Sequence, residues 1–349
     1  MALVHSHRQS EYRVTLLDSQ NNIIRKLDGV IGGTVSLSSS TRLRASGSLE
    51  LSEQAMPINW MRDRVKIEYV PSGMDPWSIG VFLLSAPVRS YSEVGSSWKV
   101  DLSSVLAIPD TDCLSSSLTV SKDVPLVKSA ADLLESSGVG FMSITPSKAK
   151  PSSDLFYDPG KSKLTVANEL LAAAGYWSAH PDGNGVVHLD PYTKPASRPV
   201  AYSFSEGDHA IHLPEWDREL DAASVPNRVI LISEGSHEKP ALVGEATNTN
   251  PASPYSYPSR GGRWVTEVQS GVEAADQKSI SSQAERRLLE LSTPTASISI
   301  HHMPVNIWPN DLVSFYSQGH SVRGSVKEIE YSLDPTELVK TKILEVAEV

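Results

Sequence analysis

The first hundred residues alternate between apolar and polar side chains. In one segment Val65, Ile67 and Tyr69 alternate with charged residues. A period of two places one face of a strand in a core and the other face in water. The same period recurs in segments 12–16, 43–51, 77–83 and 98–102. Five or more strands at such short spacing predict an antiparallel β-barrel or sandwich, which we assign to residues 1–108.

The pattern changes near Pro109 to the spacing of amphipathic helices. Segment 123–136 places its apolar residues on one face, and segment 165–175 repeats this arrangement. Thr165 is the expected N-cap of the second helix, and Gly175 is its expected C-terminal stop. The sequence therefore predicts two short helices after the first β-rich region.

A turn sequence, Asp182-Gly183-Asn184-Gly185, follows the second helix and separates two short apolar segments. Gly and Asn supply the positive φ that a tight turn needs, which predicts a β-hairpin. His180 and His188 would then face each other as a cross-strand pair rather than a metal site. We expect a small α+β insert at residues 109–163 and a helix-plus-hairpin α+β domain at residues 164–215.

A second β-barrel is predicted at residues 216–349. The spacing of apolar residues predicts a helix at 272–291 within it. Further segments alternate with a period of two, and a β-bulge near 324–327 would keep the apolar residues of one strand on a single buried face. The expected fold class is thus β-rich α+β, with two small antiparallel β-barrels and α+β domains between them.

Residues 233–262 are rich in Pro, Ser, Asn, Gly and Tyr. A segment of this length without a helix or strand pattern is typical of a functional arm or of disorder. We expect an exposed arm that becomes ordered on a partner, with plain disorder as the alternative.

Composition narrows the functional classes. The formal net charge is −10, whereas non-specific binding to duplex nucleic acid needs a basic surface. The single cysteine, Cys113, excludes a disulfide framework within one chain, and we expect it to be a small buried side chain. Residues 1–11 show no signal peptide, and no apolar run approaches the ~18 residues that span a bilayer. We therefore expect synthesis in a cytoplasm and no stable membrane insertion.

The histidines do not predict a metal site. His209 and His212 lie three residues apart, but Pro214 follows and no helical pattern surrounds them. A solvated loop is therefore their expected setting. His301 and His302 end a predicted strand, so their side chains point to opposite faces. We expect surface roles for both, and no metal or cofactor site.

Four carboxylates, Glu215, Asp217, Glu219 and Asp221, form a cluster. A glycosidase needs two carboxylates ~5 to ~9 Å apart in a cleft, and sequence spacing alone does not establish such a pair. A solvated acidic face is the simpler interpretation. Segment Gly29–Gly33 is only superficially like a dinucleotide loop, because no predicted helix follows to present its N-terminus to a phosphate. Other catalytic motifs are absent, so no catalytic residue is predicted.

Seven segments together carry a resemblance to a known family: Leu27–Gly33, Ser48–Leu51, Asn59–Val65, Trp77–Ser85, Pro226–Val229, Ala284–Leu288 and Trp308–Val313. They resemble the baseplate hub, or tail hub, proteins of long-tailed bacteriophages, and read like the minor tail proteins of actinobacterial siphophages. The likeness spans nearly the whole chain as a pattern of elements. Such hubs usually have a glycine-aspartate turn where this chain has Asn310-Asp311. Asn tolerates positive φ, so we expect the turn to be retained.

The resemblance implies a structural virion protein at the tail tip or baseplate. Such hubs are trimers with two similar β-barrels per chain, which form a pseudo-six-fold ring. The ring adapts the six-fold tail tube or distal tail ring to the three-fold tail tip and lines the DNA channel. The implied partners are the distal tail protein hexamer, the tape measure protein and tail-tip or fibre proteins, with DNA only in transit. Four tryptophans are expected either in the core or as interface anchors: Trp60, Trp77, Trp98 and Trp308.

Two other classes remain open. A tail-associated peptidoglycan hydrolase is one, although no segment resembles a hydrolase and we expect no enzymatic activity. A carbohydrate-binding module for host recognition is the other, and it would present clustered exposed aromatic residues. Only Tyr255 and Tyr257 form such a pair in the sequence. Cell-wall clearing by the purified chain would favour the first class, and glycan binding would favour the second.

Overall fold

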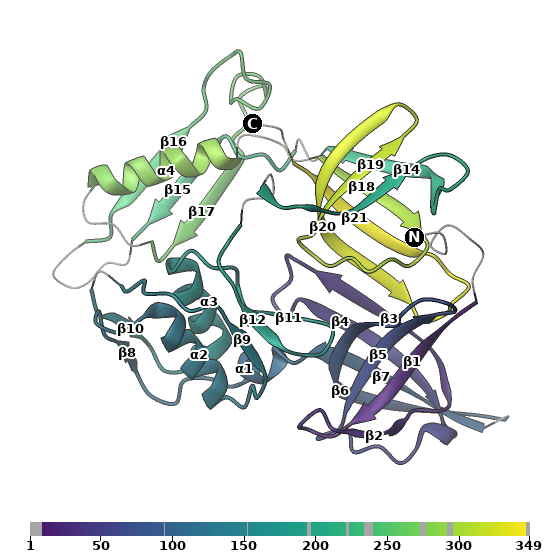
Figure 1. Ribbon diagram of the computed structural model, residues 1–349. Helices are drawn as coiled ribbons and strands as arrows, with labels where there is room; N and C mark the ends of the chain where they lie inside the picture. Colours follow the sequence, from purple (N-terminus) through teal and green to yellow (C-terminus); the bar gives the residue numbers. More distant parts are fainter. Residues whose placement is uncertain are drawn as a thin grey trace. The chain divides into compact units, whose positions relative to one another are not determined.

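The computed structural model describes residues 9–93, 95–151, 153–193, 197–220, 223–233, 240–272, 277–291 and 296–346 (Figure 1). The chain forms two units. The first comprises Met1–Trp216 and Ser299–Glu348, and the second comprises Asp217–Ile298. Most of the regular structure is β-strand, as the sequence predicts.

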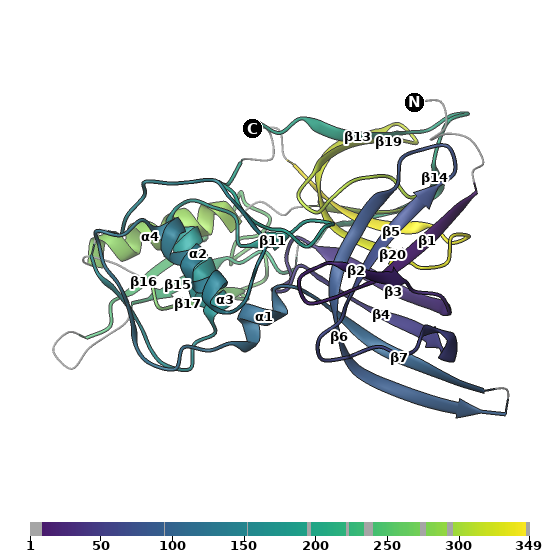
Figure 2. The ribbon, with the colours of Figure 1, turned by 60° about the horizontal axis from the view of Figure 1, so that its bottom comes forward.

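The N-terminal hundred residues form antiparallel strands. These elements are β1 (Ser10–Leu17), β2 (Ile23–Lys26), β3 (Val30–Ser38), β4 (Ala45–Ser52), the 3-10 helix η1 (Glu53–Ala55), β5 (Arg64–Pro71), β6 (Trp77–Ser92) and β7 (Gly95–Ser104). The alternation predicted in β5 is confirmed, because Val65, Ile67 and Tyr69 are all buried. The outer half of the β6–β7 hairpin projects beyond the other strands (Figure 2).

Residues 105–189 share one hydrophobic core. Its elements are α1 (Ala107–Thr111), β8 (Leu118–Val120), α2 (Leu126–Ser136), β9 (Met142–Ile144), β10 (Leu155–Tyr157), α3 (Lys163–Ala173), β11 (His180–Pro181) and β12 (Val187–Leu189). Leu134 of α2 and Leu170 of α3 are completely buried in this core. The predicted boundary between residues 163 and 164 is therefore wrong, because neither helix buries its apolar face without the other.

Local details around α3 also differ from the prediction. The N-cap is Ser162 rather than Thr165, since the Ser162 hydroxyl accepts a hydrogen bond from the Thr165 amide at 3.2 Å. Cys113 is exposed, not buried as expected, in a segment whose backbone bridges to Ser162.

A second group of strands joins the first into a single thirteen-stranded sheet. The added strands are β13 (Val200–Ser205), β14 (His212–Leu220), β18 (Ala296–His302), β19 (Leu312–Ser317), β20 (His320–Ser332) and β21 (Val339–Glu345). Along one edge β20 pairs first with β19 and then with β3, while its other edge pairs with β21. The predicted bulge is confirmed as a register shift between Val326 and Glu328.

This long strand explains why the structure differs from the expected pair of barrels. With thirteen residues, β20 extends past β19 and offers its remaining edge to β3. The main path of paired strands runs from β14 to β2, and no pairing among the described strands closes it into a barrel. The two β regions are therefore parts of one open sheet.

The second unit has a small fold of its own. Strands β15 (Arg228–Ile232), β16 (Val243–Thr247) and β17 (Thr266–Ser270) form a sheet, and α4 (Gln277–Leu291) packs on it. Val229 and Leu231 of β15 contribute to one core with Ile280 and Ala284 of α4. The predicted helix is thus confirmed at Gln277–Leu291, but it packs on this three-stranded sheet and not on the strands of the predicted C-terminal barrel.

The segment 233–262, expected as an exposed arm, contains β16 and a series of turns. The completely buried Asn227 fixes the backbone directly after these turns. Its side-chain amide donates to the Arg263 carbonyl at 2.9 Å, and its side-chain oxygen accepts from the Val265 amide at 2.7 Å. Residues 243–247 therefore belong to the sheet and not to an arm. For residues 248–262, most of which are exposed, the expected arm stays a prediction, and residues 234–239 lie outside the described part.

Candidate functional site

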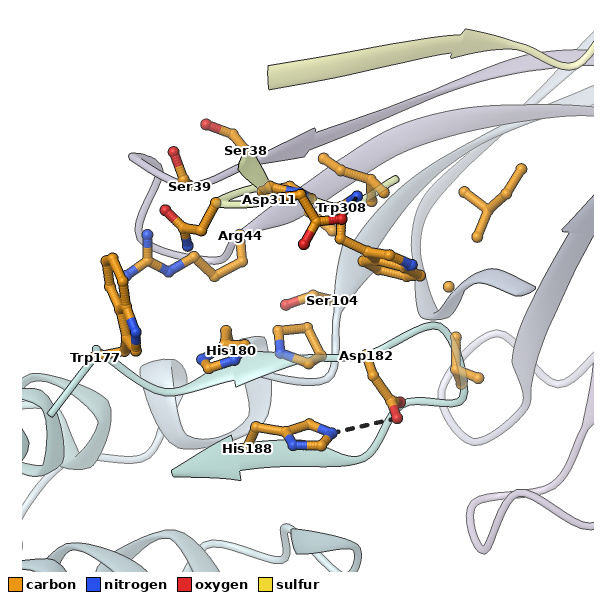
Figure 3. A pocket seen from close by; sticks show the side chains of 18 of the residues that line it. Ser38, Ser39, Arg44, Ser104, Trp177, His180, Asp182, His188, Trp308 and Asp311 are labelled. Carbon is orange, nitrogen blue, oxygen red and sulfur yellow. Dashed lines mark hydrogen bonds and ion pairs between the residues drawn. The ribbon is translucent and has the colours of Figure 1, made fainter. Parts of the chain in front are cut away.

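A pocket of about 490 Å³ lies in the first unit, where three parts of the sequence meet. Figure 3 shows Ser38, Ser39, Arg44 and Asp311 on one side of it and the β11–β12 hairpin on the other. Strand residues with apolar side chains complete the lining: Leu37, Ala45, Ile79, Val81 and Phe82. A mostly apolar cavity of this size with a few convergent polar groups is typical of ligand sites.

The β11–β12 hairpin forms one wall because its tip packs closely on β6. A Cβ atom on Gly183 would lie 2.5 Å from the Ser78 carbonyl oxygen, so only glycine allows this approach. The Ser78 hydroxyl also donates to the side-chain oxygen of Asn184 at 3.2 Å. The Asp182-Gly183-Asn184-Gly185 turn therefore does more than reverse the chain, because it places the hairpin against the sheet.

The two histidines of this hairpin face each other, as predicted. His180 and His188 are paired across the strands, with ring centroids 5.7 Å apart. His188 Nε2 lies 3.3 Å from an Asp182 carboxylate oxygen (Figure 3). Burial lowers the pKa of His180, so this ring is neutral at neutral pH. The Asp182 carboxylate therefore has a polar partner within the hairpin, the His188 ring.

The turn at Trp308–Asp311 supplies part of the opposite side. Asn310 has φ of 75°, the left-handed conformation that its side chain tolerates, and the predicted turn is confirmed. The Asp311 carboxylate accepts a hydrogen bond from the Trp308 amide at 2.8 Å. Burial raises the pKa of Asp311, and the hydrogen bond from Trp308 and the charge of Arg198 oppose that rise.

Arg198 clamps this turn to the segment that follows the hairpin. Its guanidinium donates to the carbonyl oxygens of Asn310 and Thr193, the latter at 2.7 Å from Nη2. It also lies over the Trp177 ring, 4.9 Å from the centroid. Its donors are therefore largely engaged with backbone, which makes Arg198 a structural residue of the pocket.

Arg44 is in a different situation. It ends the loop between β3 and β4 with φ of 64°, where the sequence pattern predicts a strand. Its Nε is buried and has no hydrogen-bond partner among the described residues, and no described carboxylate lies close enough to influence its charge. Burial lowers the pKa of Arg44. Sequence reasoning missed this residue because neither its position nor its neighbours mark it.

Exposed apolar side chains gather at free strand edges of the first unit. Ile23 and Ile24 of the short edge strand β2 are 76% and 49% exposed. Val88 and Tyr91 on the projecting half of β6 are 59% and 75% exposed. From Ser85 to Ser92 one edge of β6 pairs with β7, and its other edge pairs with no described strand. Such edges favour pairing with another chain.

Solved structures with this fold cover almost the whole chain. A tail protein from Neisseria meningitidis aligns with 96% of this chain and 97% of its own, at TM-score 0.67 and 11% identity. A 43 kDa tail protein of prophage MuSo2 from Shewanella oneidensis aligns over 95% and 98%, at 0.64 and 13%. Prophage tail protein gp18 from Listeria monocytogenes aligns over 97% and 95%, at 0.56 and 12%.

This chain has a phage tail protein fold. The likeness covers the small α+β region and the second unit as well as the large sheet, since it leaves no more than a few per cent of the chain unmatched. No protein-family model matches the sequence, and no curated protein matches it. At such low identity the likeness shows the fold alone.

Two histidines outside the pocket, His212 and His302, are part of the packed interior of the protein. His212 begins β14 and His302 ends β18, and both are buried, so the expected surface role of His302 and loop setting of His212 are wrong. The His302 ring packs against Phe204, and the His212 ring packs against Phe315. His301 is exposed, as alternation along the strand predicts. The described residues hold no group of three or more metal-ligating side chains.

The described members of the carboxylate cluster lie on an exposed strand and not in a cleft. Glu215, Asp217 and Glu219 alternate on β14 and are exposed, in agreement with a solvated acidic face. None of them lines the pocket. Asp221 lies outside the described residues. Val30–Gly33 are the first residues of β3, and no helix follows them directly, as the sequence predicts.

The four tryptophans are neither fully buried nor fully exposed. Trp60 lies against Trp98 with centroids 5.3 Å apart, and Trp77 lies 4.8 Å from Tyr69. Trp308 lines the pocket. Their expected assignment to core or interface therefore stays a prediction. Among the helices that the structure describes, none is both long and apolar enough to span a membrane.

Proposed function

We propose that the protein is a structural virion component, a trimeric hub of a phage tail tip or baseplate. The observation that carries the proposal is the whole-length likeness of its fold to tail proteins. The exposed isoleucines of β2 and the open outer edge of β6 support it, because such edges are stable in solution when another chain covers them.

In this role the two β regions of each chain give three subunits six positions in a ring. The ring adapts a six-fold tail tube or distal tail ring to a three-fold tail tip, with the tape measure protein and tip or fibre proteins as further partners. The net charge of −10 suits a channel through which DNA slides without being held. The protein acts by assembly and not by catalysis.

The mass of the purified particle tests the proposal. Light scattering should give three times the chain mass of 37.8 kDa, and electron microscopy should show a three-fold ring with a central channel. A chain that stays monomeric even with its neighbouring tail proteins would contradict the proposal.

A pair of variants tests the position of the interface. Tyr91 and Phe156 are equally exposed, at 75%, but only Tyr91 lies on the projecting hairpin. Tyr91→Ser should weaken trimer formation by about tenfold or more, because aromatic anchors dominate interfaces. Phe156→Ser should leave association unchanged. Equal effects of the two variants would place the interface elsewhere.

The absence of catalysis is part of the proposal. The described carboxylates of β14 are exposed and lie outside the pocket, and the two carboxylates that line the pocket, Asp182 and Asp311, accept hydrogen bonds from backbone amides. The purified protein should therefore leave a peptidoglycan zymogram uncleared. Clearing by the protein would instead support a tail-associated hydrolase.

A further inference from the structure

The half-buried guanidinium of Arg44, whose Nε has no acceptor among the described residues, is the feature of the pocket that these residues leave unexplained. Taking a cation out of water is costly unless an anion or hydrogen-bond acceptors replace the water. Arg44 Nε is buried without an acceptor among the described residues. The backbone of Arg44 is also left-handed, which is uncommon for a long side chain and is found more often at functional sites.

The other charged groups of the pocket do not compensate Arg44. Asp182 accepts hydrogen bonds from the amides of Asn184 and Val186 and lies beside His188. Asp311 accepts from the Trp308 amide and is close enough to Arg198 for the two charges to interact. Both carboxylates therefore have partners, and Arg44 is left as the one cation of the pocket without a described counter-ion.

We propose that this pocket binds a carboxylate that carries an apolar body, with the carboxylate on Arg44. The planar guanidinium matches a carboxylate in a two-point hydrogen-bonded pair. The apolar body would lie against Ile79, Phe82 and Pro181, which line the same space. All of these lining residues belong to a single chain, so the site does not require the proposed trimer.

The pocket favours one negative charge over several. Asp182 and Asp311 are part of its lining, so a phosphate or other multiply charged anion would be repelled at close range. Most of the lining surface is apolar, although about half of the lining residues have polar side chains, and this surface favours a ligand with an aromatic or branched aliphatic group. A free organic acid and the C-terminal residue of a protein chain share this chemistry.

Calorimetry with four probes tests the site and separates the two sources. Phenylacetate represents a free acid, and N-acetyl-Leu-Phe with a free carboxylate represents a chain terminus. Phenylacetamide and the C-terminal amide of the peptide are their uncharged controls. We expect at least one acid to bind ~10-fold to ~100-fold more tightly than its amide, the range typical of a charge-assisted hydrogen bond.

The acid that binds more tightly identifies the source of the natural ligand. Tighter binding of phenylacetate would point to a free acid, and tighter binding of the peptide acid would point to a chain terminus. Binding of neither acid, or equal binding of acids and amides, would overturn the proposal.

Variants then test the role of Arg44. Arg44→Gln should lose the preference for acid over amide, while Arg44→Lys should keep part of it. The matched control is Arg42→Gln, because Arg42 lies in the same loop but pairs with Asp110 outside the pocket.

Stability without ligand gives a second and independent measurement. Arg44→Gln removes a half-buried charge that has no described counter-ion, so its melting temperature should equal or exceed that of the wild type. A structural arginine would show the opposite. A marked fall in melting temperature together with an unchanged preference for acids would overturn the proposal.

Discussion

The buried imidazole of His302 should make the stability of the sheet depend on pH. His302 is 1% exposed and tilts against the Phe204 ring with centroids 4.8 Å apart. Its Nδ1 lies 2.7 Å from the Met303 carbonyl oxygen and its Nε2 lies 2.7 Å from the Thr341 hydroxyl. A neutral ring satisfies both groups, since Nδ1–H donates to the carbonyl and Nε2 accepts from the hydroxyl.

Burial lowers the pKa of His302 from 6.5 to about 4, and the nearby His212 and His301 act in the same direction. One pKa unit corresponds to about 1.4 kcal/mol, so the whole difference amounts to about 3 kcal/mol. The unfolded chain binds this proton more readily than the folded chain. The folding free energy from this group is thus complete above about pH 6.5 and is lost progressively as the pH falls to about 4.

Urea denaturation followed by circular dichroism at about pH 8 and about pH 5 measures this effect. His302→Gln removes the titrating group, and His301→Gln is the matched control, because its side chain is exposed on the same strand. Between these pH values the free energy of unfolding of the wild type and of His301→Gln should fall by about 2 kcal/mol more than that of His302→Gln. This difference arises in the part of the interval below pH 6.5. Parallel pH dependence of wild type and His302→Gln would refute the reasoning.

Two further substitutions test how the pocket is built. Gly183→Ala should lower the free energy of unfolding in urea by about 1 to 3 kcal/mol, because the new Cβ would meet the Ser78 carbonyl oxygen. Gly140→Ala is the control, since its Cβ would meet nothing within 4 Å. Equal stability of the two variants would contradict the packing of the hairpin on β6. Asn310→Gly should keep the stability of the wild type, while Asn310→Val should lower it by about 1 to 2 kcal/mol in thermal melts, because a branched side chain disfavours φ of 75°. A valine that is tolerated as well as glycine would contradict the left-handed turn.

Short-range patterns predicted the individual elements well. Alternation located β5 and β6, helical spacing located α2, α3 and α4, and Asp182-Gly183-Asn184-Gly185 identified the hairpin. These features depend on residues a few positions apart, so the local sequence contains the information that decides them. The bulge in β20 was also predictable, because Val326 was out of phase with the rest of its strand.

The pocket was only partly predictable. The facing pair His180 and His188 and the turn at Asn310 followed from turn chemistry. Arg44 and Arg198 did not, because nothing in a single sequence shows that one guanidinium is bonded to backbone carbonyls and another is left without a partner. That distinction depends on the meeting of segments more than a hundred residues apart.

The sequence by itself determined the longer elements such as β5, β6, α2, α3 and α4, where the tight turns lie, and that the chain is acidic with a single cysteine. The tertiary structure alone decided that β20 joins both β regions into one sheet and that α4 packs on β15 and β16. It also decided that His302 is buried and that Arg44 faces a cavity. The physical reason is that periodicity specifies which face of an element is apolar, while the partner of that face depends on long-range packing.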